Sequence, residues 1–100
     1  MEWIDKNKFK FIKRLGIFKK FKYPILVNES NKPIQVNWQD AREYMKQGYY
    51  SYRKVRGYGW VLYRLSNKGK LQEANAYSGW LEIDDILEHG FEDWLIANPL

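Results

Sequence analysis

The chain has no cysteine and no threonine, and its 100 residues include one histidine and three prolines. The absence of cysteine excludes disulfide bonds, thiolate zinc sites and a cysteine nucleophile, and a single histidine excludes a histidine-rich metal centre. The longest apolar runs cover only a few residues, whereas a transmembrane helix needs roughly 20. We therefore expect no membrane span, no metal site and no cofactor.

The first residues also lack the signals that direct export. The segment Met1–Asp5 contains two acidic residues and no basic stretch followed by an apolar one, so it does not resemble a signal peptide. Together with the absence of cysteine, this predicts a protein of the cytoplasm.

Aromatic residues, in contrast, are abundant, at 18% of the chain. A domain this small buries only about 60% of the surface that its unfolded chain exposes, so its core is thin. The aromatic excess therefore indicates either a compact core or a binding face. Association with further copies of the chain would reinforce such a core, and a homo-oligomer is expected.

The net charge of +5 is distributed unevenly along the chain. Residues 1–35 carry nine Lys or Arg against three Asp or Glu, and residues 36–70 carry eight against two. Residues 71–100 carry seven acidic side chains and no Lys or Arg. The basic part could bind phosphates, or it could pair with the acidic end within one chain or between copies.

The basic residues at the beginning of the chain suggest a division into two parts. We interpret residues 1–22 as a basic N-terminal arm or edge strand, and residues 23–100 as a compact α+β domain. Alternating Phe and Lys at 8–11 favour a strand, whereas the spacing of Phe11, Leu15 and Phe18 favours a helix. The segment could contact a host protein, nucleic acid or an anionic membrane surface.

One main helix is predicted over about 38–47. Asn37 is a suitable N-cap, Asp40 lies near the positive end of the helix dipole, and Gly48 can end the helix. A short second helix is predicted over about 84–89.

The remaining segments have the alternation typical of strands. Residues 23–36 favour a hairpin with a polar turn, and glycines at 57, 59 and 69 mark two further turns. Ser78 and Gly79 are also expected to form a turn. Strands are predicted over 49–56, 60–65, 70–77 and 91–97. Strands on both sides of one helix predict an α+β fold, a small single domain with an antiparallel sheet.

Catalytic patterns are weak in this sequence. The acidic pairs at 84–85 and 92–93 occupy positions typical of helix caps and surface charges. His89 lies at the expected end of the second helix, where its role is open, and Gly57–Gly59 lacks the third glycine of a dinucleotide fingerprint. These observations predict a protein that is not an enzyme.

Residues 49–64 favour a binding function instead, because basic and aromatic side chains alternate there. Arginine binds phosphates through two parallel hydrogen bonds, and aromatic faces stack on bases. A hairpin with an aromatic core and a solvated basic face would produce the same pattern. From this chemistry we select Arg56, Tyr58 and Trp80 as candidate ligand-binding residues.

Short motifs across residues 37–97 resemble the small phage proteins of the second Thoeris anti-defence family. The matching segments are Asp40-Ala41 with Lys46-Gln47-Gly48, then Arg53, then Trp60-Val61-Leu62, then Asp84-Asp85-Ile86-Leu87, and finally Glu92-Asp93-Trp94. Arg56 replaces a tryptophan of the family pattern, and His89-Gly90-Phe91 interrupts its last motif. The resemblance implies a compact α+β homo-oligomer that sequesters cyclic ADP-ribose-type signals without hydrolysing them. It assigns Arg53 to a phosphate and Trp60 to the pocket wall.

Two functions therefore remain as expectations. The first is a phage-type anti-defence protein that binds a cyclic ADP-ribose-like nucleotide through Arg53, Arg56, Tyr58, Trp60 and Trp80, in the host cytoplasm. The alternative is a small basic inhibitor that binds a host nucleic-acid enzyme, or nucleic acid directly, through residues 1–22.

Overall fold

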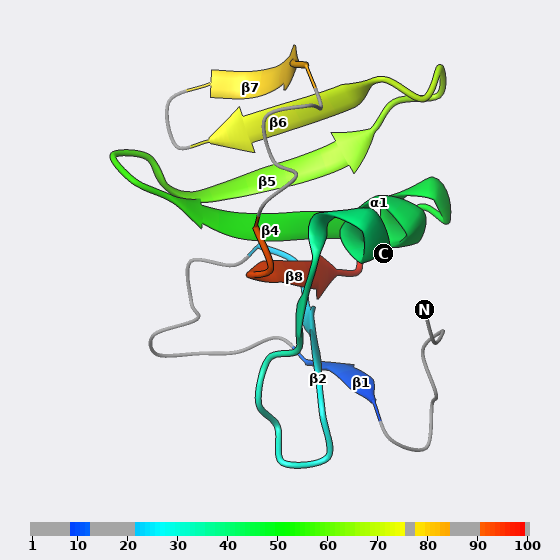
Figure 1. Cartoon of the computed structure of the whole chain (residues 1–100), viewed down its shortest axis with the longest axis vertical. Helices are drawn as coiled ribbons and strands as arrows, with labels where there is room; N and C mark the ends of the chain where they lie inside the picture. The colour runs from blue at the N-terminus through cyan, green and yellow to red at the C-terminus, as the bar shows by residue number, and fades with distance from the viewer. Residues whose placement is uncertain (1–8, 13–21, 76–77, 85–90, 100) are drawn as a thin grey trace.

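The computed structural model describes residues 9–12, 22–75, 78–84 and 91–99. These residues form eight strands and one helix, arranged as Figure 1 shows. In chain order the elements are β1 (Lys10–Ile12), β2 (Ile25–Val27), β3 (Gln35–Val36), α1 (Trp38–Lys46), β4 (Tyr50–Val55), β5 (Gly59–Leu65), β6 (Leu71–Asn75), β7 (Ser78–Glu82) and β8 (Trp94–Ala97).

All strand pairs are antiparallel, and the sheet has the order β1-β2-β8-β4-β5-β6-β7. The last strand, β8, lies in the middle of this order, and β3 also pairs with it. The predicted antiparallel sheet with one main helix is thus confirmed, and most of the described elements are strands. The expected helix at 84–89 lies, except for Asp84, outside the described residues.

Helix α1 begins and ends where its capping residues predict. The side-chain oxygen of Asn37 accepts a hydrogen bond from the backbone N–H of Asp40 at 2.8 Å, and Gly48 has a positive φ of 96°. A left-handed backbone at this position favours glycine and ends the helix. The buried side of α1 carries Trp38, Ala41, Tyr44 and Met45, and it packs over β8, β4 and β5.

The β4–β5 and β5–β6 turns follow the glycine signals, whereas two other turn predictions differ from the structure. The hairpin predicted over residues 23–36 forms only in part, because one isolated bridge joins Val27 to Pro33 whereas β2 and β3 each pair with β8 and not with each other. The β4–β5 turn contains Gly57, with Gly59 as the first residue of β5, and the β5–β6 turn contains Gly69; all three glycines have a positive φ. The turn expected at Ser78 and Gly79 was wrong, because both residues lie in β7 and Ser78 pairs with Asn75. A strand needs only extended backbone, which serine and glycine adopt readily when a neighbouring strand is present.

The two faces of the sheet are packed against different partners. On the side that faces α1, Trp94 is fully buried, with ring centroids of Trp38 and Tyr63 at 4.9 and 4.8 Å. Successive side chains of β4 and β5 point to opposite faces of the sheet. Tyr52 therefore belongs to a second cluster, on the other face, with Ile25 and Leu95. We call the first side the helix face and the second side the open face, because α1 packs on the first.

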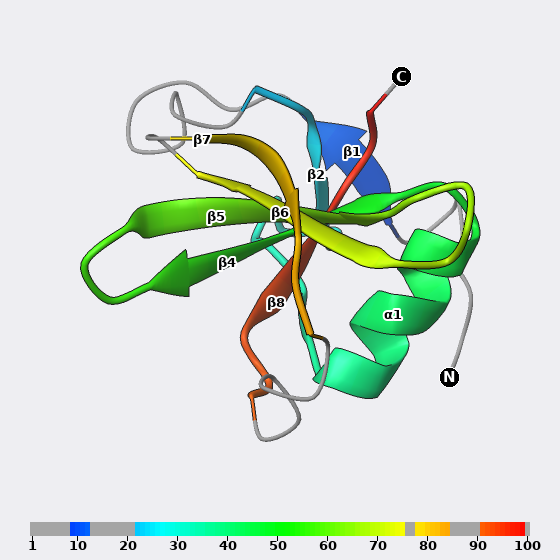
Figure 2. The ribbon, with the colours of Figure 1, turned by 90° about the horizontal axis from the view of Figure 1, so that it is seen from above.

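Strand β7 is rotated strongly relative to β4 and β5, as the view from above in Figure 2 shows. The twist follows the right-handed twist of individual strands, which accumulates across a sheet. Among the residues that the structure describes, no helix has the length and apolar character needed to cross a bilayer.

Candidate functional site

The open face of the sheet gathers an arginine and several aromatic rings from strands that are not neighbours. Tyr50 of β4 and Trp80 of β7 lie with ring centroids 5.4 Å apart, although two strands separate them in the sheet. The ring of Tyr23 packs edge-on against Tyr50 at 5.3 Å. The twist of the sheet therefore brings β7 across towards β4 on this face.

Arg64 of β5 lies within this group, and its guanidinium is held on three sides. Its Cζ atom is 3.9 Å from the centroid of a Trp80 ring, a cation–π contact. Its Nε donates a hydrogen bond to Oε1 of Gln72 at 2.8 Å, and Nη1 is 3.5 Å from the Tyr50 hydroxyl oxygen. Gln72 is the register partner of Arg64 in β6, which explains the first bond.

These partners of Arg64 are all uncharged. Within the described part of the chain, no carboxylate forms an ion pair with this half-buried guanidinium, whose remaining N–H groups have no hydrogen-bond partner there. Partial removal of a charge from water is costly unless an opposite charge or further hydrogen bonds compensate for it. Arg64 is therefore fixed in position by neutral groups and suited to accept an anion.

A hollow of about 370 Å³ lies beside this arginine. The described residues that line it are Tyr50, Arg64, Leu65, Ser66, Asn67 and Gln72. Small-molecule sites have volumes of roughly 300–1,000 Å³, so the hollow is within their range. It combines one cation, two side-chain amides, two hydroxyls and one aromatic ring. We call this group the Arg64 site.

Arg53, which the resemblance assigned to a phosphate, lies on the helix face and has a different environment. Its residue exposure is 8%, and its Nε donates to Oδ1 of Asp93 at 2.9 Å. Its Cζ is 3.4 Å from the centroid of the Phe91 ring. A phosphate that bound Arg53 would compete with a carboxylate already in place.

The other sequence-predicted residues are distributed over both faces. Tyr58 is 53% exposed beside the β4–β5 turn, where Arg56 is also exposed. Trp60 packs on the open-face cluster, and Trp80 supports Arg64. Of the predicted site residues, the structure thus brings only Trp80 into contact with the Arg64 site, through the guanidinium of Arg64, and it places Arg53 and Tyr58 on the opposite face.

Sequence reasoning did not select Arg64, Tyr50 or Gln72. A signal was present for the first two, because both lie in the alternating Arg and aromatic segment at 49–64. Gln72 had no such signal, since its role depends on the β5–β6 register.

Tyrosines on both faces have altered acidity. Burial raises the pKa of Tyr52, and the nearby Tyr23 hydroxyl acts in the same direction. Hydrogen bonds from the backbone of Tyr23 and Lys22 to the phenol oxygen partly offset this effect. Burial also raises the pKa of Tyr44, with further contributions from Asp40 and Tyr49. Both phenols are therefore neutral at physiological pH.

Metal binding has no support in the described ranges, where no group of three or more His, Cys, Asp or Glu side chains comes together. Comparison with models of protein families, with curated proteins and with solved structures finds no match for this chain.

Proposed function

We propose that this protein binds a phosphate-bearing nucleotide at the Arg64 site and sequesters it unchanged. The observation that carries the proposal is the position of Arg64, which is held by Trp80, Gln72 and Tyr50 beside a hollow of about 370 Å³. A guanidinium whose orientation is already fixed loses little conformational entropy when it binds a phosphate through two hydrogen bonds.

The remaining lining of the hollow suits the other parts of a nucleotide. Asn67 and Gln72 carry amides, which can donate to and accept from base edges or ribose hydroxyls. The Tyr50 ring offers an aromatic surface beside them. A bare inorganic anion would use the guanidinium but would leave these groups without a role.

The resemblance to the second Thoeris anti-defence family supports a more specific ligand. We propose a cyclic ADP-ribose-type signal, which combines phosphates with a purine base and is sequestered by that family. The function is then that of a phage anti-defence sponge that acts in the host cytoplasm, where the signal is produced.

The proposal includes no chemical step on the ligand. The described lining residues are arginine, amides, hydroxyls and apolar groups, with no His, Cys, Asp or Glu among them. General acid–base catalysis at neutral pH needs a group whose pKa lies near the working pH. We therefore expect the ligand to be released intact when the protein is denatured.

Self-association forms part of the same proposal. Strand β7 is at one end of the described sheet order and carries Glu82, whereas β1 at the other end carries Lys10. Opposite charges at the two sheet ends favour contact between copies of the chain. Light scattering after size-exclusion chromatography, at low and high salt, measures the oligomer directly.

A second candidate function rests on the β4–β5 turn. Lys54 and Arg56 are exposed there, next to Tyr58, which is 53% exposed. Basic and aromatic side chains on one surface are typical of proteins that bind single-stranded nucleic acid. This alternative, a basic inhibitor of a host nucleic-acid enzyme or a direct nucleic-acid binder, also involves residues 1–22, most of which lie outside the described ranges.

Calorimetric titration with cyclic ADP-ribose tests the first proposal. We expect Arg64→Met to weaken binding by roughly tenfold to 150-fold, the range for loss of charged hydrogen bonds. The matched control is Arg56→Met, which removes an arginine of equal charge outside the hollow. Arg53→Met, measured in parallel, tests the assignment made from the resemblance.

Three outcomes would overturn the proposal. These are no heat of binding at high micromolar ligand, recovery of a degraded ligand after denaturation, and equal losses for Arg64→Met and Arg56→Met. A steep decrease of nucleic-acid binding with salt, lost in Arg56→Met, would instead favour the second candidate.

A further inference from the structure

The polar side chains around the hollow beside Arg64 have one property in common. Four of them present hydrogen atoms, rather than free acceptor atoms, to anything that enters the hollow. They are Arg64, Gln72, Tyr50 and Ser66. The hydrogen bonds that these groups already make within the protein explain why, and they restrict the ligand further than the charge of Arg64 does.

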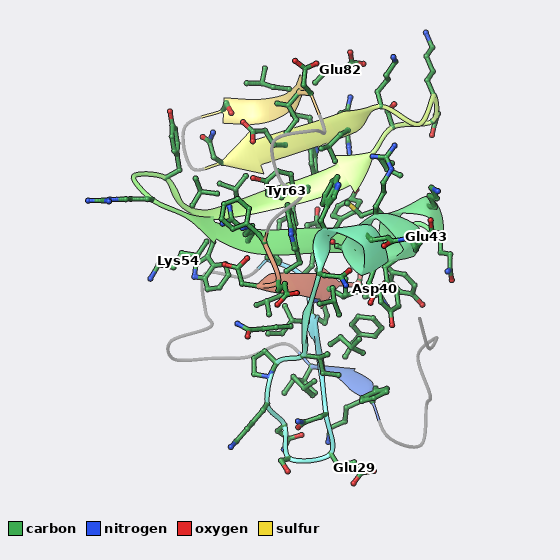
Figure 3. The ribbon with its side chains drawn as sticks, viewed as in Figure 1. Glu29, Asp40, Glu43, Lys54, Tyr63 and Glu82 are labelled. Carbon is green, nitrogen blue, oxygen red and sulfur yellow. The ribbon has the colours of Figure 1, made fainter. Side chains whose placement is uncertain are left out.

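The orientation of the Gln72 amide follows from its contact with Arg64. Every nitrogen of a guanidinium donates and none accepts, so the Gln72 atom at 2.8 Å from Nε of Arg64 is the carbonyl oxygen. The amide NH2 group is therefore left for a ligand, since no described residue accepts from it. Glu82, the register partner of Gln72 in β7, is exposed at the outer end of the sheet (Figure 3) and is not part of the described lining.

The two hydroxyl groups of the hollow are in a similar situation. Oγ of Ser66 accepts from the backbone N–H groups of Lys68 and Lys70, at 3.3 and 3.2 Å, and these bonds occupy both of its lone pairs. The Tyr50 oxygen is 3.5 Å from Nη1 of Arg64, which can only donate, so the phenol hydrogen points elsewhere. Each hydroxyl is therefore left with a hydrogen to donate.

The described lining contains no carboxylate that could accept in return. Asn67 differs from the other polar side chains, because its amide both donates and accepts, but it is exposed in the β5–β6 turn. A ligand group with its own hydrogen, such as a protonated phosphate, would therefore place one donor against another beside Arg64. An unpaired donor in a half-buried site weakens binding by about tenfold or more.

We propose that Gln72, Tyr50 and Ser66 make the Arg64 site selective for an oxyanion that carries no hydrogen, namely the phosphodiester or pyrophosphate group of its ligand. This inference rests on the proposed nucleotide binding and names the part of the nucleotide that is recognised. A phosphodiester has no P–OH group near neutral pH, whereas a phosphate monoester gains a proton with a pKa of about 6. Arg64 supplies the charge, and the three donors determine the specificity.

Phenyl sulfate and phenyl phosphate test this selectivity on the unmodified chain. Near pH 5, about one unit below the second pKa of a phosphate ester, both carry one negative charge and differ by one hydroxyl hydrogen. In heteronuclear NMR titrations at constant ionic strength, each should bind with a Kd on the order of 1–10 mM and shift the amides of Ser66, Asn67 and Gln72.

The order of the two affinities is the decisive result. Near pH 5 phenyl sulfate should bind roughly threefold to tenfold more tightly, because the P–OH group of phenyl phosphate finds no acceptor. Near pH 8 phenyl phosphate is a dianion without hydrogen, about two units above that pKa, and the order should reverse. Both ligands are compared at the same pH, so titration of the exposed Glu82 affects them alike.

Two tyrosine variants assign part of the selectivity to one hydroxyl. Tyr50→Phe removes a donor and should weaken phenyl sulfate binding by roughly threefold to tenfold. Tyr23→Phe is its matched control, because the Tyr23 ring packs against Tyr50 but is not part of the described lining. This control should leave binding unchanged, and thermal unfolding of both variants verifies that they fold.

Two glutamine variants test the donor amide. Gln72→Glu places a carboxylate against Arg64, as Asp93 lies against Arg53, and should weaken phenyl sulfate binding by more than about tenfold. Gln39→Glu makes the same change of charge at an exposed position of α1 and should leave binding unchanged.

The inference is overturned if neither ligand shifts the amides of the hollow, if the two bind equally near pH 5, or if phenyl phosphate is preferred there. It is also overturned if either control variant has the effect of its partner. The proposed function fails separately. If cyclic ADP-ribose does not bind but phenyl sulfate is preferred as expected, the selectivity stands without that ligand. If cyclic ADP-ribose binds and Gln72→Glu does not weaken it, the selectivity alone is contradicted.

Discussion

Arg53 and Arg64 lie on the two strands of one hairpin, yet the sheet gives them opposite surroundings. Arg53 points to the helix face and pairs with Asp93, whereas Arg64 points to the open face and has only uncharged partners in the described structure. Both guanidinium groups pack on an aromatic ring, at 3.4 Å from Phe91 and 3.9 Å from Trp80.

The comparison shows which contact decides the role of an arginine. Aromatic packing holds the guanidinium in place in both cases and does not distinguish them. The carboxylate of Asp93 does, because it supplies the charge that a phosphate would otherwise supply. An arginine with a fixed orientation and no counter-ion is therefore the better candidate for binding an anionic ligand.

The largest loss of stability is expected from a substitution on the helix face, which holds the main core. Trp94→Ala should lower the free energy of unfolding by about 3–5 kcal/mol, because a fully buried tryptophan between Trp38 and Tyr63 leaves a cavity. Trp80→Ala on the open face, where the ring is half-buried, should cost less than half as much. Urea unfolding of both variants measures the difference, and equal losses would contradict this division between the faces.

The next largest losses of stability are expected when the contacts of the two arginines are removed. Asp93→Ala should lower stability by about 2 kcal/mol, because it leaves the guanidinium of Arg53 buried without its charged partner. Arg64→Met should lower stability by about 1 kcal/mol, since hydrogen bonds to neutral groups and the cation–π contact with Trp80 are lost but no ion pair of the described structure is broken. Denaturant unfolding tests both. If Arg64→Met were the more destabilising, Arg64 would be a structural residue, and the case for an anion site would be lost.

Local signals in the sequence were sufficient to predict much of the fold. Asn37 and Gly48 bound α1 correctly, and glycines of positive φ mark the turns on either side of β5. The alternation of side chains along a strand also accounts for the position of Tyr50 and Arg53 on opposite faces of β4. These features depend on residues close together in the chain, which is why the sequence alone indicates them.

Non-local pairing could not be predicted in the same way. Insertion of β8 between β2 and β4 depends on residues more than forty positions apart, and no local pattern specifies it. The pairing of Arg53 with Asp93 follows from that insertion, so the sequence did not show that this arginine has a carboxylate partner. The Arg64 site depends on the twist that brings Trp80 over β5, which is likewise a property of the whole sheet.

The smallest expected effect is on stability at alkaline pH, and it concerns one buried tyrosine from each face. Burial raises the pKa of both Tyr44 on the helix face and Tyr52 on the open face, so each phenol loses its proton more readily in the unfolded chain. The stability that they contribute is complete below the unfolded pKa of about 10 and is lost as the pH rises through the higher folded value. Tyr44→Phe and Tyr52→Phe should each reduce the loss of stability between pH 9 and 11.5, as urea unfolding across roughly that range would show.

Because lysines also titrate there, the informative quantity is the difference in unfolding free energy between each variant and the parent chain. If that difference is the same at every pH, the phenols do not contribute to alkaline unfolding. If only Tyr52→Phe reduces the loss of stability, the Tyr52 phenol is shielded from water more strongly than the Tyr44 phenol. The open face around Tyr52 is then less accessible to water than the hollow beside Arg64 suggests.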